Sequence, residues 1–118
     1  MRRLISFDID GTLEVGDPPG VISLAVVRRA LDLGFVVGSC SDRPLSFQRA
    51  LWHHHAIPVN FTLLKQHLSH AKEFAADQYL HIGDSFIDQT MAKQAGFDFL
   101  HSVEDDVHAF LRRLRLLG

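Results

Sequence analysis

Five short apolar runs, each followed by a segment with helical spacing, are the feature that most constrains the fold of this chain. The apolar runs cover residues 4–7, 35–40, 59–64, 79–82 and 97–100. The helical segments cover residues 21–33, 45–55, 66–77 and 88–95, with a last one capped by residues 102–105. Strands and helices in alternation predict a parallel sheet covered on both faces. We therefore expect a three-layer α/β/α sandwich around a five-stranded, mostly parallel, Rossmann-like sheet.

Composition narrows the class of protein. With 118 residues, 47% of them apolar and 22% charged, the chain has enough material for one globular domain over residues 1–118. A net charge of -2 gives no support for broad electrostatic binding to nucleic acid. The single cysteine, Cys40, excludes an internal disulfide and fits a reducing compartment. Neither a membrane-spanning run nor a signal-peptide pattern is present, so we expect a cytoplasmic protein without a membrane partner.

The first apolar run ends at two acids. Residues two apart in an extended backbone point to the same side, so Asp8 and Asp10 can face one pocket. Gly11 permits a sharp turn directly after them, and the hydroxyl of Thr12 follows. Two carboxylates this close repel unless a cation balances them, and oxygen-rich sites of this kind suit Mg²⁺. This stretch therefore predicts a magnesium site.

Polar residues also stand at the ends of three later runs. Ser41 ends the second strand, Lys65 follows the third, and Asp84 ends the fourth. In open parallel sheets, ligands bind beyond the carboxyl ends of the strands, where the strand order reverses. We therefore expect these side chains to meet Asp8 at one edge of the sheet.

This ordered set resembles the motifs of the haloacid dehalogenase-like hydrolases over about residues 4–100. Residues 8–12 (DIDGT) resemble the first motif, Ser41 the second, a lysine the third, and residues 83–88 (GDSFID) the fourth. The resemblance implies a small, capless, magnesium-dependent phosphatase that forms an aspartyl-phosphate.

The roles of individual residues follow from the same resemblance. Asp8 is expected to be the nucleophile, while Asp10 is expected to act first as general acid and then as general base. The expected ligands of Mg²⁺ are Asp8, the backbone carbonyl of Asp10, and Asp84, with Asp88 in support. The group expected to hold the phosphate consists of Thr12, which also orients Asp10 or fixes the loop, together with Ser41, Arg43 and Lys65.

The lysine of the third motif is either Lys65 or Lys72. Lys65 stands directly after a strand, where the other site residues stand, whereas Lys72 falls within a predicted helix. Position alone favours Lys65.

Two other functional classes compete with a phosphatase. A receiver-like signalling module also has five strands and a phosphorylated aspartate, but it expects that aspartate after its third strand, where this chain has Lys65. A binding or regulatory protein that keeps the fold without activity is the other alternative. Asp10 favours the phosphatase, because relatives that cleave other bonds generally lack an acid there.

The spacing of the motifs also bears on the substrate. Residues 13–40 and 43–64 are each used up by a helix, a strand and their connections, so neither interval has room for a cap domain. An open site favours a bulky phosphorylated substrate or a homo-oligomer. Arg43, Arg49 and Trp52 loosely resemble the phosphatase half of phage polynucleotide kinase-phosphatases. A nucleic-acid 3′-phosphate is therefore an alternative substrate, with Trp52 expected in the core rather than against a base.

Overall fold

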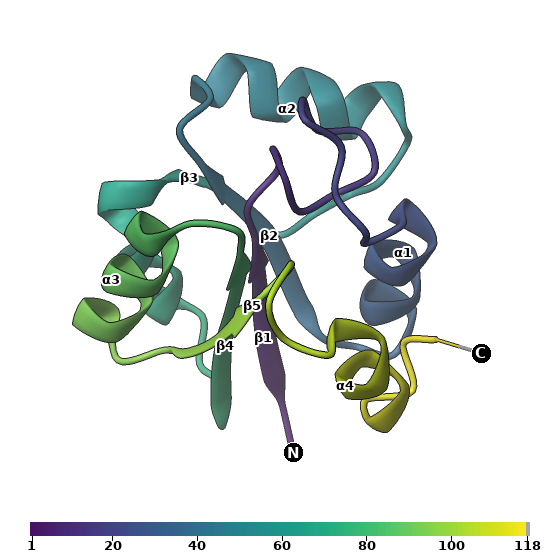
Figure 1. Ribbon diagram of the computed structural model, residues 1–118, viewed down its shortest axis with the longest axis vertical. Helices are drawn as coiled ribbons and strands as arrows, with labels where there is room; N and C mark the ends of the chain where they lie inside the picture. The colour runs from purple at the N-terminus through teal and green to yellow at the C-terminus, as the bar shows by residue number, and fades with distance from the viewer. Residues whose placement is uncertain (118) are drawn as a thin grey trace.

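The computed structural model describes residues 1–117 and contains a parallel five-stranded sheet between two layers of helices (Figure 1). The strands are β1 (Arg3–Phe7), β2 (Val36–Ser41), β3 (Phe61–Leu64), β4 (Gln78–Gly83) and β5 (Asp98–His101). They lie in the order β3-β2-β1-β4-β5, and every neighbouring pair is parallel. The predicted three-layer, Rossmann-like sandwich is confirmed.

Helices cover both faces of the sheet. They are α1 (Leu24–Asp32), α2 (Leu45–His54), the 3-10 helix η1 (Lys65–Glu73), α3 (Phe86–Ala95) and α4 (Val107–Arg113). Buried side chains of α1, α2 and α4 join one apolar cluster, and those of η1 and α3 join a second cluster. No helix among residues 1–117 has the length and apolar character needed to cross a bilayer.

Successive side chains along each strand point alternately to the two faces of the sheet, and this alternation separates the two clusters. On β1, Ile5 and Phe7 belong to the cluster beneath α1 and α4, while Leu4 belongs to the cluster beneath η1 and α3. Successive side chains of a strand point to opposite faces, and a sheet covered on both faces therefore needs apolar residues at nearly every position. This is why the strands read as continuous apolar runs.

The segment predicted to be helical over residues 66–77 is helical in its first part, but the predicted length is wrong. The structure has a 3-10 helix that ends at Glu73, with an irregular turn at His67, and the chain is extended at Phe74. Lys65, Leu68 and Ala71 are its buried residues, so burial recurs every third position. A 3-10 helix has three residues per turn, and this spacing therefore fits it better than an α-helix.

The helix predicted over residues 45–55 is confirmed, but its buried face differs from the prediction. Trp52 is buried in the core, as expected, whereas Phe47 is 40% exposed. Gln48 is buried instead and makes three hydrogen bonds. Its amide group donates to the carbonyls of Arg43 and Leu63, and its side-chain oxygen accepts from Ser39. A buried glutamine is hidden from a search for apolar spacing.

Two other helix starts shift for local reasons. The helix predicted from residue 21 begins at Leu24, whose backbone N–H donates to the carboxylate of Glu14, while Ile22 pairs with Leu13. The last helix is capped by Asp106 and not by residues 102–105. Ser102 is buried and donates its hydroxyl to the carbonyl of Gly11 instead, which fastens the loop after β1.

The strand order reverses between β1 and β4. From β1 the chain moves to β2 and β3 on one side, and then crosses to β4 and β5 on the other side. The backbone N–H of Asp8 donates to the carbonyl of Ile82 at 2.9 Å, so the two strand ends stay together. Ligand sites of doubly wound sheets lie at such reversals, beyond the carboxyl ends of the strands.

Candidate functional site

Most of the predicted site residues meet at this reversal, around a cavity of about 240 Å³. The residues that line it are Asp8, Asp10, Ser41, Asp42, Lys65, Asp84, Ser85 and Ile87. Asp88 contacts Lys65 behind the cavity wall, whereas Thr12 and Arg43 do not line the cavity. The side chains of Asp10 and Asp42 are 29% and 73% exposed, so the cavity opens to solvent.

Lys65 is the buried cation of this site. Its ammonium Nζ lies 3.2 Å from Asp8 Oδ2, 3.3 Å from Asp88 Oδ2 and 3.4 Å from Asp42 Oδ2. Burial acts to lower the pKa of Lys65, but the charges of these three carboxylates outweigh burial and hold that pKa above its usual range. Lys65 is therefore a permanent positive charge within reach of the nucleophile candidate.

Lys72 lies away from the cavity. Its ammonium group sits over the rings of Tyr79 and Phe97, 5.5 and 5.9 Å from their centroids. The residue is exposed on η1 beside the C-terminal end of α3. Of the two lysines that the sequence leaves open, the structure brings Lys65 to the other site residues.

Asp8 is the most electrostatically strained acid of the cluster. It is 3% exposed, and burial followed by the nearby charge of Asp88 raises its pKa to about 8, against the opposing charge of Lys65. One carboxylate oxygen accepts the backbone N–H of Ile9 at 2.7 Å. The site thus holds Asp8 in a fixed orientation but disfavours its charge until more positive charge arrives.

Asp88 is the opposite case. Burial acts to raise its pKa, but the hydrogen bond and charge of His81 outweigh burial, with help from Ser85 and Lys65, and leave the pKa below its usual range. Its carboxylate also forms a capping box with Ser85 at the start of α3. Asp88 is therefore the ionised partner of Lys65.

Asp10 is paired with Arg43. The guanidinium Nε lies 2.8 Å from Asp10 Oδ2 and a terminal nitrogen 3.1 Å from Oδ1, a two-pronged contact. Burial acts to raise the pKa of Asp10, but the Arg43 hydrogen bonds and the backbone N–H of Asp17 lower it below its usual range. Arg43 also stacks on Phe47, 4.7 Å from its ring centroid. In this arrangement Arg43 contacts an acid of the site.

The two hydroxyl residues of the predicted phosphate group lie in different surroundings. Ser41 lines the cavity, and its oxygen accepts the backbone N–H of Arg43 at 3.0 Å. Thr12 is fully buried, and its hydroxyl has no hydrogen-bond partner among the described residues. The backbone of Thr12, bonded to Ile9 and Ile22, holds the loop after β1 in place.

Two glycines leave room for the acids. Gly11 has a φ of +71° and faces the carboxylate of Asp84 so closely that a Cβ atom would overlap it. A Cβ atom on Gly83 would likewise overlap the carboxylate of Asp88. Glycine at these two positions therefore lets the backbone come close to a carboxylate, and it also allows the chain to turn there.

The donor set fits a hard divalent cation. Asp8, Asp84 and Asp88 can each offer one carboxylate oxygen, and those atoms lie within 4.8 Å of one another. Around them, the carboxylates of Asp8, Asp42, Asp84 and Asp88 outnumber the ammonium group of Lys65. Oxygen donors and excess negative charge suit Mg²⁺ or Ca²⁺.

Three residues that take part in the site are not predicted from the sequence: Asp42, Ser85 and His81. Asp42 and Ser85 are neighbours in sequence of predicted site residues, and this position is a signal that could have identified them. His81 carries no such signal, because it lies within an apolar run and its partners are distant in sequence or on the next helix.

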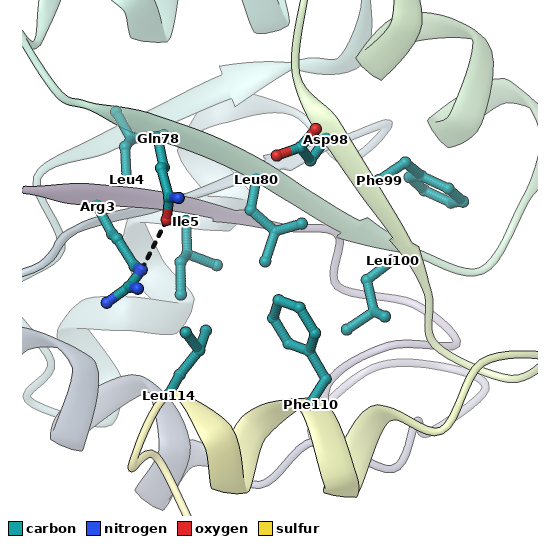
Figure 2. A pocket seen from close by; sticks show the side chains of 10 residues that line it. All are labelled: Arg3, Leu4, Ile5, Gln78, Leu80, Asp98, Phe99, Leu100, Phe110 and Leu114. Atoms are coloured by element: carbon teal, nitrogen blue, oxygen red, sulfur yellow. Dashed lines mark hydrogen bonds between the residues drawn. The ribbon is translucent and has the colours of Figure 1, made fainter.

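A larger cavity, of about 360 Å³, lies toward the opposite end of the sheet (Figure 2). Its walls are apolar side chains of β1, β4 and β5 that face Phe110 and Leu114 of α4. Arg3 and Gln78, joined by a 2.8 Å hydrogen bond, stand at the first residues of their strands. No acid cluster lines this cavity, so its size does not make it the chemical site.

Comparison with known proteins gives no family: no family model matches the chain, and no curated protein has significant sequence similarity to it.

The raised pKa of Asp8 leads us to expect that the stability of the folded protein depends on pH. Between about pH 4 and pH 8, folded Asp8 holds a proton that the unfolded chain has released, so the metal-free protein loses stability as pH rises through this window. Asp8→Asn removes this pH-dependent loss of stability, because an amide does not titrate. We expect its melting temperature in chelator to exceed that of the wild type at pH 8, with a much smaller difference at pH 5.

The exposed variant Asp32→Asn is the control, and it should show no such pH dependence. An equal difference between Asp8→Asn and wild type at both pH values would contradict the shifted pKa.

Proposed function

We propose that this protein is a magnesium-dependent phosphatase of the haloacid dehalogenase-like type, which hydrolyses a phosphomonoester through an aspartyl-phosphate on Asp8. The observation that carries the proposal is the placement of Asp8. It ends β1 at the reversal of strand order, lines an open cavity, and lies 3.2 Å from the ammonium group of Lys65. A carboxylate nucleophile beside a fixed cation is an arrangement suited to phosphoryl transfer.

The first step makes a bond to Asp8. A carboxylate oxygen of Asp8 attacks phosphorus, the ester P–O bond breaks, and the phosphoryl group is transferred to Asp8. Lys65 and the hydroxyl of Ser41 face the same cavity and would hold the oxygens of the transferring group. Hydrogen-bond donors held in place beside the charge that develops in the transition state stabilise it most where water is excluded.

Asp8 and Asp84 are the residues that would hold Mg²⁺. Asp88 is within reach of the same point, but Lys65, His81 and Ser85 already engage its oxygens. When bound, Mg²⁺ would neutralise charge on the transferring phosphoryl group and lower the pKa of Asp8.

Asp10 would move the protons. It would give a proton to the leaving alcohol and later take one from the water that splits the aspartyl-phosphate, which releases inorganic phosphate. Its pair with Arg43 must open first, since that pair engages both oxygens and keeps the pKa of Asp10 too low for it to hold the proton that the alcohol needs. The side chains of Arg43 and Asp10 are 35% and 29% exposed, so solvent screens the attraction between their charges. A phosphate dianion can therefore draw Arg43 from Asp10.

The rim of the cavity favours an ester with an apolar group. Ile87 lines the cavity and is 54% exposed, and its neighbour Phe86 is 80% exposed. Apolar side chains beside an open polar site offer a surface for the organic part of a substrate. An aryl phosphate is therefore the first substrate to test.

The alternatives gain less support. A receiver-like module would have the strand order 2-1-3-4-5, whereas this sheet has the order 3-2-1-4-5. Trp52 is 3% exposed, so it offers no platform for a base of a nucleic-acid end. A binding protein that keeps the fold without activity would differ from the phosphatase only in having no turnover, so an activity measurement distinguishes the two.

We expect the purified protein to hydrolyse an aryl phosphate with Mg²⁺ present and to stop when a chelator is added. Asp8→Asn should abolish turnover, because an amide cannot serve as the nucleophile, while Asp32→Asn should match the wild type. Release of inorganic phosphate is the measurement. Turnover by Asp8→Asn, or activity that survives the chelator, would refute the mechanism.

The two lysines supply a matched pair for a second test. Lys65→Met removes the ammonium group near the phosphate but keeps an unbranched apolar side chain, and we expect a fall of about 10²–10³ in kcat. Lys72→Met should stay within about twofold, because its ammonium group lies over the rings of Tyr79 and Phe97 and does not line the cavity. The opposite ranking in steady-state kinetics would transfer the role to Lys72.

A further inference from the structure

His81 is a buried histidine in the middle of β4. It points to the same side of the sheet as Tyr79, whose ring packs in the cluster beneath η1 and α3. It is 1% exposed and does not line the cavity. Its register partners are Ser6 on β1 and Phe99 on β5. Both ring nitrogens are engaged: Nδ1 lies 3.0 Å from the hydroxyl of Ser6 and Nε2 lies 2.8 Å from Asp88 Oδ1.

A continuous line of contacts joins His81 to the nucleophile. Asp88 is fully buried, and its second oxygen, Oδ2, accepts from the Ser85 hydroxyl at 2.7 Å and from Lys65 at 3.3 Å. Lys65 in turn lies 3.2 Å from Asp8. Two residues, Asp88 and Lys65, thus stand between His81 and Asp8 in this chain of contacts.

His81 engages one oxygen of the Asp88 carboxylate, whereas Ser85 and Lys65 engage the other. A buried carboxylate with a free oxygen would turn toward any available donor or cation, since an unpaired buried charge is costly. The Nε2 contact occupies Oδ1 and leaves Oδ2 for Lys65. The hydroxyl of Ser6 holds the other side of the ring and so fixes its plane.

We propose that His81 is a positioning residue, which holds the Asp88 carboxylate in the orientation that aims Lys65 at Asp8. The effect on turnover rests on the proposed function, whereas the effect on Lys65 does not.

Two amide variants separate the two contacts of the ring. Gln places its amide nitrogen near the position of histidine Nε2 and can donate to Asp88. Asn places its polar atoms near Nδ1 and can reach Ser6 but not Asp88. We expect His81→Gln to keep kcat within about threefold of wild type and His81→Asn to lose about 10–100-fold, as for other partners that orient a site residue from behind.

Tyr79→Phe is the control on the same strand and face. It removes a hydroxyl that contacts Phe74 and Ala76 and has no contact with Asp88, so kcat should stay within about twofold of wild type. Equal losses in His81→Gln and His81→Asn, or full activity in both, would overturn the proposal.

A second measurement does not depend on activity. The NMR signal of the Lys65 ammonium group reports its contacts with Asp8 and Asp88. We expect the signal to shift in His81→Asn and to keep its wild-type position in His81→Gln and Tyr79→Phe. An unchanged Lys65 signal in folded His81→Asn overturns the positioning role. A shifted signal in a protein whose wild type shows no phosphatase activity overturns the proposed function alone.

Discussion

The burial of Lys65 among carboxylates is the interaction on which the rest of this site depends. An ammonium group taken out of water is stabilised only where opposite charges surround it closely. Asp8, Asp42 and Asp88 all lie within 3.4 Å of its nitrogen, so the lysine and the acids hold one another in place. Because the acids outnumber the lysine, the cluster still favours one more cation.

The same arrangement lowers the stability of the folded protein. Asp8 is buried beside a second carboxylate, which raises its pKa to about 8 and makes its charged form costly in the folded protein. Acids with perturbed pKa values of this kind gather at functional sites. Gly11 and Gly83 leave room for the carboxylates of Asp84 and Asp88, and the apolar core on both faces of the sheet compensates for the electrostatic cost.

The fold and the strand-end residues follow from local patterns, because apolar runs stop where polar residues begin. The position of Lys65 is predictable for that reason. The 3-10 helix after it is not, since apolar residues three apart, such as Leu68 and Ala71, also share one face of an α-helix. His81 is hidden for a different reason: its contacts with Ser6 and Asp88 depend on the register of β1 beside β4 and on the capping of α3. Register and capping partners are fixed only in three dimensions.

In the proposed mechanism, Asp8 carries the phosphoryl group during turnover. The direct measurement is an acid quench of the protein during hydrolysis of a radiolabelled aryl phosphate with Mg²⁺, followed by mapping of protein-bound phosphate by mass spectrometry. We expect label on Asp8, and more of it in Asp10→Asn, because the water that removes the phosphate then lacks its base. Label on another residue, or turnover with no protein-bound phosphate in either protein, would contradict the account.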